Sequence, residues 1–144
     1  MKLKQHSILH IITTMNMGGA EKQLLLLIRQ QMKVGHQVQI CILKKKPELI
    51  NQLNKQKVDI ISVGLDLKTI FKVRRLLREQ AIIVHAHLPR AEIVARFCLI
   101  AKTNLFFVTR HNAEDFGSGR NFGPLNWLSK VILKRANGII AISR

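Results

Sequence analysis

Residues whose types could do chemistry follow the ends of three apolar runs, 8–13, 82–88 and 105–110. They are Asn16, Gly18, Gly19 and Glu21 after the first run, His85 and His87 at the end of the second, and Arg110, His111 and Asn112 at and after the end of the third. Short, β-branched apolar runs are typical of buried strands. Ligands of parallel α/β sheets bind outside the carboxyl ends of the strands. We therefore expect these side chains to converge on one cleft.

The stretch 15–19 is predicted to turn from a strand into a helix, because leucines recur at helical spacing from Ala20 onward. A helix start exposes unpaired N–H groups and the positive end of the helix dipole, and both favour an anion. The alternative is that Gly18 and Gly19 serve only to make a tight turn. Glu21, in the first helical turn, could equally do no more than favour the dipole.

The histidines also allow two interpretations. His85 and His87 are two positions apart, which places them on one face of a strand. They could be two ligands of a metal, but the sequence offers no third partner, so we expect hydrogen bonds at the edge of a core and no metal site. His111, between Arg110 and Asn112, is the best candidate for general chemistry or for contact with an anion.

Several common motifs are missing from the sequence. The letters MGGAEK do not form G-x-G-x-x-G, and no acidic residue follows the second predicted strand, where a dinucleotide ribose would need one. There is no G-K-[ST] of a P-loop, no nucleophile elbow and no helix-turn-helix. Dehydrogenase and P-loop functions are therefore disfavoured.

The whole chain alternates between strands and helices. Strands are predicted over 8–13, 36–43, 58–64, 82–88, 105–110 and 138–143, and helices from Ala20, over 47–56, after Asp66, from Pro89 to about Ala101, and over 124–135. In the helix after Asp66, Leu67, Ile70, Phe71, Val73 and Leu77 are expected to face inward. Apolar strands that are each separated by a helix indicate a doubly wound parallel sheet, an α/β fold of Rossmann type.

Composition narrows the class of protein. The 144 residues are 47% hydrophobic, enough for one domain with a real core, and they carry 24 basic and 8 acidic residues, a net charge of +16. Such an excess favours an anionic partner. Cys41 and Cys98 lie in apolar segments and are expected to be buried thiols of a reducing compartment. No apolar run approaches the ~20 residues of a membrane span. We expect a cytoplasmic protein, with peripheral attachment to the inner face of the membrane as a further option.

Four segments, MNMGGAEKQLLLLIRQQMKVGHQVQI, IIVHAHLPRAEIVAR, FFVTRHN and ANGIIAISR, resemble the N-terminal domain of family 4 (group 1) glycosyltransferases of the GT-B fold. The resemblance implies transfer of a sugar from a nucleotide-diphosphate donor to an acceptor, with the anomeric configuration retained and without a metal or other cofactor. It implies that residues 1–144 form the acceptor-side domain. The second, donor-binding domain of the family, with its pair of glutamates, is absent from this sequence, so we expect a truncated chain that is inactive alone.

By the same resemblance, Gly18 and Gly19 approach donor phosphate or sugar, His111 is the catalytic histidine, and His85 and His87 line the cleft. Asn16, Glu21, Arg110 and Asn112 are assigned to substrate binding. Relatives act on cell-surface glycans or lipid-linked acceptors, and several bind membranes. A basic segment that carries aromatic residues can sit in an anionic interface. The predicted membrane contacts are Phe116, Arg120, Trp127, Lys130, Lys134 and Arg135.

Two functions from different classes therefore remain. The first is the acceptor-side domain of a retaining glycosyltransferase, which needs a nucleotide sugar, an acceptor and a missing domain or partner subunit. The second is a non-catalytic basic module that binds anionic membrane lipid or another anionic partner. A specific nucleic-acid target is disfavoured, because no reader motif is present.

Overall fold

The computed structural model describes residues 5–80, 82–99, 104–110, 131 and 134–141. Its elements are β1 (Ser7–Ile12), α1 (Gly19–Lys33), β2 (Gln37–Ile42), α2 (Ile50–Lys55), β3 (Asp59–Val63), α3 (Leu67–Glu79), β4 (Ile82–His87), α4 (Pro89–Cys98), β5 (Leu105–Arg110) and β6 (Gly138–Ala141). The strands form one sheet in the order β3-β2-β1-β4-β5-β6, and all of its pairs are parallel. The predicted doubly wound parallel sheet is confirmed.

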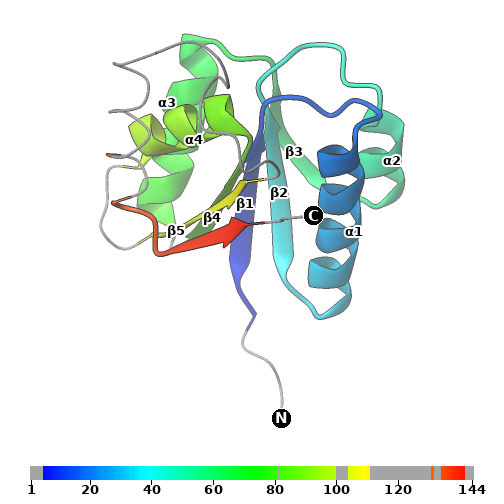
Figure 1. Cartoon of the computed structure of the whole chain (residues 1–144), viewed down its shortest axis with the longest axis horizontal. Helices are drawn as coiled ribbons and strands as arrows, with labels where there is room; N and C mark the ends of the chain where they lie inside the picture. The colour runs from blue at the N-terminus through cyan, green and yellow to red at the C-terminus, as the bar shows by residue number, and fades with distance from the viewer. Residues whose placement is uncertain (1–4, 81, 100–103, 111–130, 132–133, 142–144) are drawn as a thin grey trace.

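The two faces of the sheet are covered by different helices. Figure 1 shows α1 and α2 on one side of the sheet and α3 and α4 on the other. A buried cluster that includes Ile28, Ile40 and Leu53 joins α1 and α2 to β1 and β2. A second cluster joins α3 and α4 to the central strands through residues such as Val84 and Ala95. The chain therefore switches faces between β3 and β4, and β1 and β4 become neighbours at the switch point.

Helix α3 differs from its prediction. Leu67 and Phe71 were expected to face inward, but 73% and 68% of their surfaces are exposed. Val73 and Leu77 are buried as predicted, Ile70 packs against the core, and Thr69 is the further member of the buried stripe. The Thr69 hydroxyl satisfies its hydrogen bonds inside, with Ser62 Oγ at 2.8 Å and the Gly64 carbonyl at 3.2 Å. The five residues predicted to point inward span a wider arc than one helix face can bury. Leu67 and Phe71, at the margin of that arc, are therefore left exposed to solvent.

Other boundaries shift by a few residues. The helix predicted over 47–56 is shorter and begins only at Ile50. Helix α4 was predicted to run to about Ala101, but it ends at Cys98, because the backbone of Leu99 is extended. The helix predicted over 124–135 falls largely outside the described residues. Its described end is a turn at Lys134 and Arg135, directly before β6. Both cysteines are buried and free, as predicted.

Candidate functional site at the carboxyl edge

The switch point brings a histidine of β1 next to the predicted histidines of β4. In the register of the two strands, His10 of β1 lies beside His85 of β4, and Ile12 lies beside His87. The turn between β1 and α1 therefore leaves the sheet next to the end of β4.

The turn before α1 is already occupied by carboxylates of the protein. Gly18 is the N-cap of α1 and makes no side-chain capping bond. Glu21 is buried, and the Thr14 hydroxyl donates to its Oε1 at 2.6 Å. A Cβ atom at Gly18 would overlap with Glu21 Oε2. The glycine thus admits the side chain of Glu21, which puts a negative charge at the positive end of the helix.

A second carboxylate binds the same turn from outside. The backbone N–H of Met17 donates to Glu48 Oε2 at 2.9 Å. Asn16 and Gly19 are exposed at this turn. A donor phosphate that used these N–H groups would have to displace Glu48 and lie near Glu21. The local electrostatics therefore do not favour the anion that the glycine pair alone predicts.

The predicted pair His85 and His87 is part of a buried cluster of three histidines. Its third member, His10, is fully buried, and its Nδ1 lies 3.0 Å from His87 Nε2. His10 Nε2 contacts Gln31 Oε1 of α1 at 2.8 Å. Burial lowers the pKa of His10 to about 4, although the bond to Gln31 opposes the shift. Sequence reasoning missed His10, which breaks an apolar strand at the position paired with His85.

The three histidines come close enough to hold a metal ion. One nitrogen from each ring lies within 4.8 Å of the others, which supplies the third partner that the sequence did not show. Zinc sites with three histidines need such an arrangement. The rings are already engaged within the protein, since His85 Nε2 also lies 2.6 Å from the Thr109 hydroxyl. The predicted hydrogen bonding at the edge of the core is confirmed.

The end of β5 is tied to α4 by an ion pair. Arg110 Nη2 lies 3.2 Å from Glu92 Oε2, and the Glu92 side chain is fully buried while that of Arg110 is 21% exposed. Burial raises the pKa of Glu92, and the hydrogen bond and charge of Arg110 oppose that rise. This pairing fixes Arg110, a predicted substrate-binding residue, at the carboxyl edge of the sheet. In the sequence, Glu92 is one of the few charged residues of an otherwise apolar helix. That position is the sequence feature that indicates a buried carboxylate with a cationic partner.

Several predicted site residues lie outside the described part of the chain. They are His111, Asn112, Phe116, Arg120, Trp127 and Lys130. Of the predicted membrane contacts, Lys134 is exposed and Arg135 is partly buried in the turn before β6. Within the described residues, no helix is long and apolar enough to cross a bilayer.

The fold and the position of this site define a doubly wound α/β protein whose polar groups meet at the carboxyl edge of the sheet. Comparison with known families adds the identity. Glycosyltransferase Family 4 matches residues 17–144, and the chain belongs to this family. Among curated proteins, none matches the chain.

Proposed function

We propose that the chain is the acceptor-side domain of a retaining glycosyltransferase. It would work with a donor-binding domain to move a sugar from a nucleotide-diphosphate sugar to a cell-surface glycan or a lipid-linked acceptor. The observation that carries the proposal is the family match over residues 17–144. The gathering of Glu21, His87 and Arg110 near the carboxyl edge supports it, because ligands of this fold bind there. No metal or cofactor is assigned to the reaction.

In this proposal His111 acts at the transferred sugar, since it follows Arg110 directly. The buried bond of Arg110 to Glu92 supports such a role, because it fixes the end of β5 from which His111 continues. Asn112 and Asn16 are assigned to substrate contacts near the same edge. The histidine pair His85 and His87 would line the site from the end of β4.

The test uses the protein at the full length that its gene encodes, incubated with nucleotide sugars and a membrane extract as acceptor. His111→Ala is expected to lower turnover by ~100-fold or more if the imidazole serves in proton transfer or comparable chemistry. His6→Ala is the control, because His6 is exposed and directly precedes β1, at the opposite edge of the sheet. Unchanged turnover in His111→Ala would remove His111 from the catalytic role.

The same experiment bears on the second candidate function, the non-catalytic basic module. The net charge of +16 favours anionic surfaces in either case. Salt-sensitive binding to anionic vesicles, together with no turnover of any nucleotide sugar by the full-length protein, would favour that module over the transferase.

A further inference from the structure

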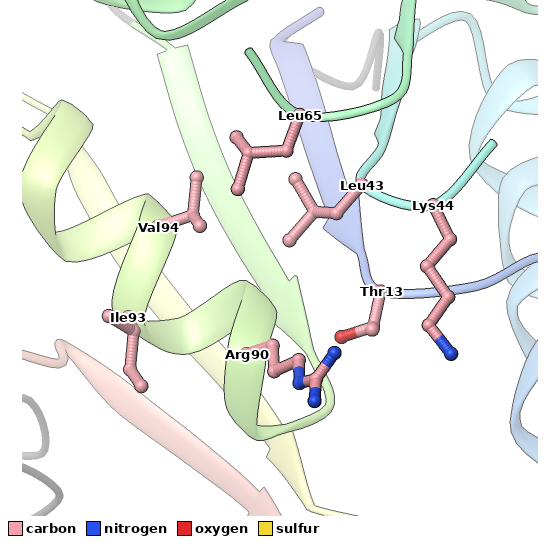
Figure 2. A pocket seen from close by; sticks show the side chains of 7 residues that line it. All are labelled: Thr13, Leu43, Lys44, Leu65, Arg90, Ile93 and Val94. Atoms are coloured by element: carbon pink, nitrogen blue, oxygen red, sulfur yellow. The ribbon is translucent and has the colours of Figure 1, made fainter. Parts of the chain in front are cut away.

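A pocket of about 270 Å³ opens at the carboxyl edge on the α4 side of β1. It lies between the chain segments that follow β1, β2 and β3 and the first turns of α4. Figure 2 shows the lining side chains, which are Thr13, Leu43, Lys44, Leu65, Arg90, Ile93 and Val94. The lining is therefore apolar on one part and carries two cationic side chains on another.

The hydroxyl of Thr13 is buried and has no partner among the residues that the structure describes. Only 9% of the Thr13 surface is exposed, and its Oγ1 makes no hydrogen bond within this part of the chain. Figure 2 shows this oxygen turned toward the guanidinium of Arg90, with the ammonium of Lys44 on the other side of Thr13. Buried polar groups are normally satisfied, so an orphaned hydroxyl at a pocket indicates a missing partner. An oxygen of a bound ligand would accept its hydrogen.

The two cations at the pocket are exposed, and within the described part of the chain no anion competes for them. Neither the Lys44 nor the Arg90 side chain forms a hydrogen bond or ion pair with any residue that the structure describes. The carboxylate on the same helix, Glu92, is engaged by Arg110. Both cationic side chains thus remain available to an anion.

The start of α4 adds to this positive field. The helix begins at Pro89, which has no N–H, and the N–H groups of Ala91 and Glu92 donate to the Leu88 carbonyl at 3.0 and 3.2 Å. What this helix start offers an anion is therefore chiefly its dipole. Leu88 has φ 74°, a strained conformation for a bulky residue. Such strain is typical of segments that a functional site holds in place.

The rest of the pocket suits an apolar chain. Leu43 is buried and forms the floor, and Leu65 is 45% exposed at the rim. Val94 and Ile93 are partly buried on α4. An apolar group that covered Leu65 would remove apolar surface from water, which favours binding. A sugar alone would leave this half of the pocket unmatched.

We propose that this pocket binds the head of an amphiphilic acceptor, an alkyl phosphate. Its phosphate oxygens lie among the Thr13 hydroxyl, Lys44 and Arg90, and the start of its chain lies against Leu65 and Val94. The inference rests on the proposed transferase function and deepens it by naming the chemical class of the acceptor. Phosphate fits the site because the Thr13 hydroxyl points toward the Arg90 guanidinium, and Lys44 lines the same pocket on a long, flexible side chain. Each of the three donors can then bind a separate oxygen.

The first test measures binding of decyl phosphate, kept below its micelle concentration, to the 144-residue chain by titration calorimetry. Lys44→Gln/Arg90→Gln is expected to bind at least ~10-fold more weakly, because two charge-assisted bonds are lost. The matched control is Arg29→Gln/Lys33→Gln, which removes the same charge from exposed positions of α1 and should bind as the wild type does. An equal loss in both double variants would overturn the proposal, since only net charge would then matter.

Thr13→Val separates a ligand contact from a structural role. The substitution removes an unsatisfied hydroxyl and keeps the shape, so the melting temperature should stay level or rise while decyl phosphate binds several-fold more weakly. A lower melting temperature with unchanged binding would show that the hydroxyl belongs to the fold and would contradict the proposal.

Further probes distinguish the possible sources of phosphate. Inorganic phosphate and decanol should each bind at least ~10-fold more weakly than decyl phosphate, because each lacks one half of the ligand. Equal binding of inorganic phosphate would identify a site for free phosphate instead. Binding to phosphatidylglycerol vesicles without binding of dispersed decyl phosphate would identify a membrane-contact surface. Either result would overturn the amphiphile assignment.

The donor is absent from these titrations, so they are independent of sugar transfer. Turnover by the full-length protein without binding of decyl phosphate would leave the transferase function standing and remove this acceptor class. Specific binding of decyl phosphate without turnover would support the pocket and count against the transferase.

Discussion

Acid should destabilise this fold through His10, whose imidazole is fully buried between β1 and α1. Burial lowers its pKa from 6.5 to about 4 in the folded chain. The unfolded chain therefore takes up the proton first as the pH falls. The stability that neutral His10 contributes is complete above pH 6.5, declines below it, and is exhausted near pH 4.

The size of the effect follows from the pKa difference. One unit of pKa shift corresponds to about 1.4 kcal/mol. Between pH 7 and pH 5, the folded state remains almost unprotonated at His10 while the unfolded state becomes protonated. The free energy of unfolding should fall by about 2 kcal/mol from this residue alone. No reduction for solvent screening applies, because the ring has no exposed surface.

The assay is urea unfolding at pH 7, 6 and 5, followed by circular dichroism and extrapolated to water. His10→Gln keeps a polar partner for Gln31 and removes the titrating ring, so it should lose about 2 kcal/mol less than the wild type over this range. His6→Gln is the control, since His6 is exposed and its replacement should leave the wild-type loss in place. Equal losses in the wild type and His10→Gln would refute a buried, neutral His10.

Two further predictions concern side chains near the turn and in the core. Gly18→Ala should lower the free energy of unfolding by about 1–3 kcal/mol, because the new Cβ collides with the buried Glu21 carboxylate. Gly19→Ala is the control, since a Cβ there meets nothing within 4 Å. It should be neutral or slightly stabilising in the same urea unfolding assay. A similar loss in both variants would show that chain flexibility, and not Glu21, requires the glycine. Cys41 and Cys98 should react with Ellman's reagent at pH 8 only after unfolding, because burial raises their pKa values to about 12 and about 11; rapid modification of the folded chain would contradict this.

The sheet was predictable because its strands are short apolar runs, separated by glycine, proline and polar residues that favour turns. The central strands β1 and β4 are buried along almost their whole length, so they can be recognised without any periodicity, whereas the edge strands β3 and β6 are only partly buried or exposed. Helix α3 was harder, because it is amphipathic with an excess of apolar residues. Phe71 looks like a core residue by type, and only the packing of Thr69 against Gly64 and Ser62 shows which arc of the helix faces the sheet.

The site was predictable in position and less so in its contacts. The ends of β1, β4 and β5 could be named from the sequence, because parallel strands share one carboxyl edge. The three-histidine cluster could not be completed, since His10 pairs with His85 only through the sheet register. Likewise, the bond between Arg110 and Glu92 joins residues that are 18 positions apart in the sequence. Such contacts depend on tertiary geometry, which local patterns do not contain.

The two threonines that follow β1 show how polar and charged groups divide between the two sides of this edge. Successive residues of an extended chain point to opposite faces of a sheet. The Thr14 hydroxyl donates to Glu21 on the α1 side, where Glu48 also binds the turn. The Thr13 hydroxyl is unpartnered in the pocket on the α4 side, where Lys44 and Arg90 lie. The carboxylates of Glu21 and Glu48 therefore lie at the glycine turn, and the cationic side chains of Lys44 and Arg90 line the pocket beside Thr13. For the anionic acceptor proposed above, this distribution of charge favours the α4 side of the edge over the glycine turn.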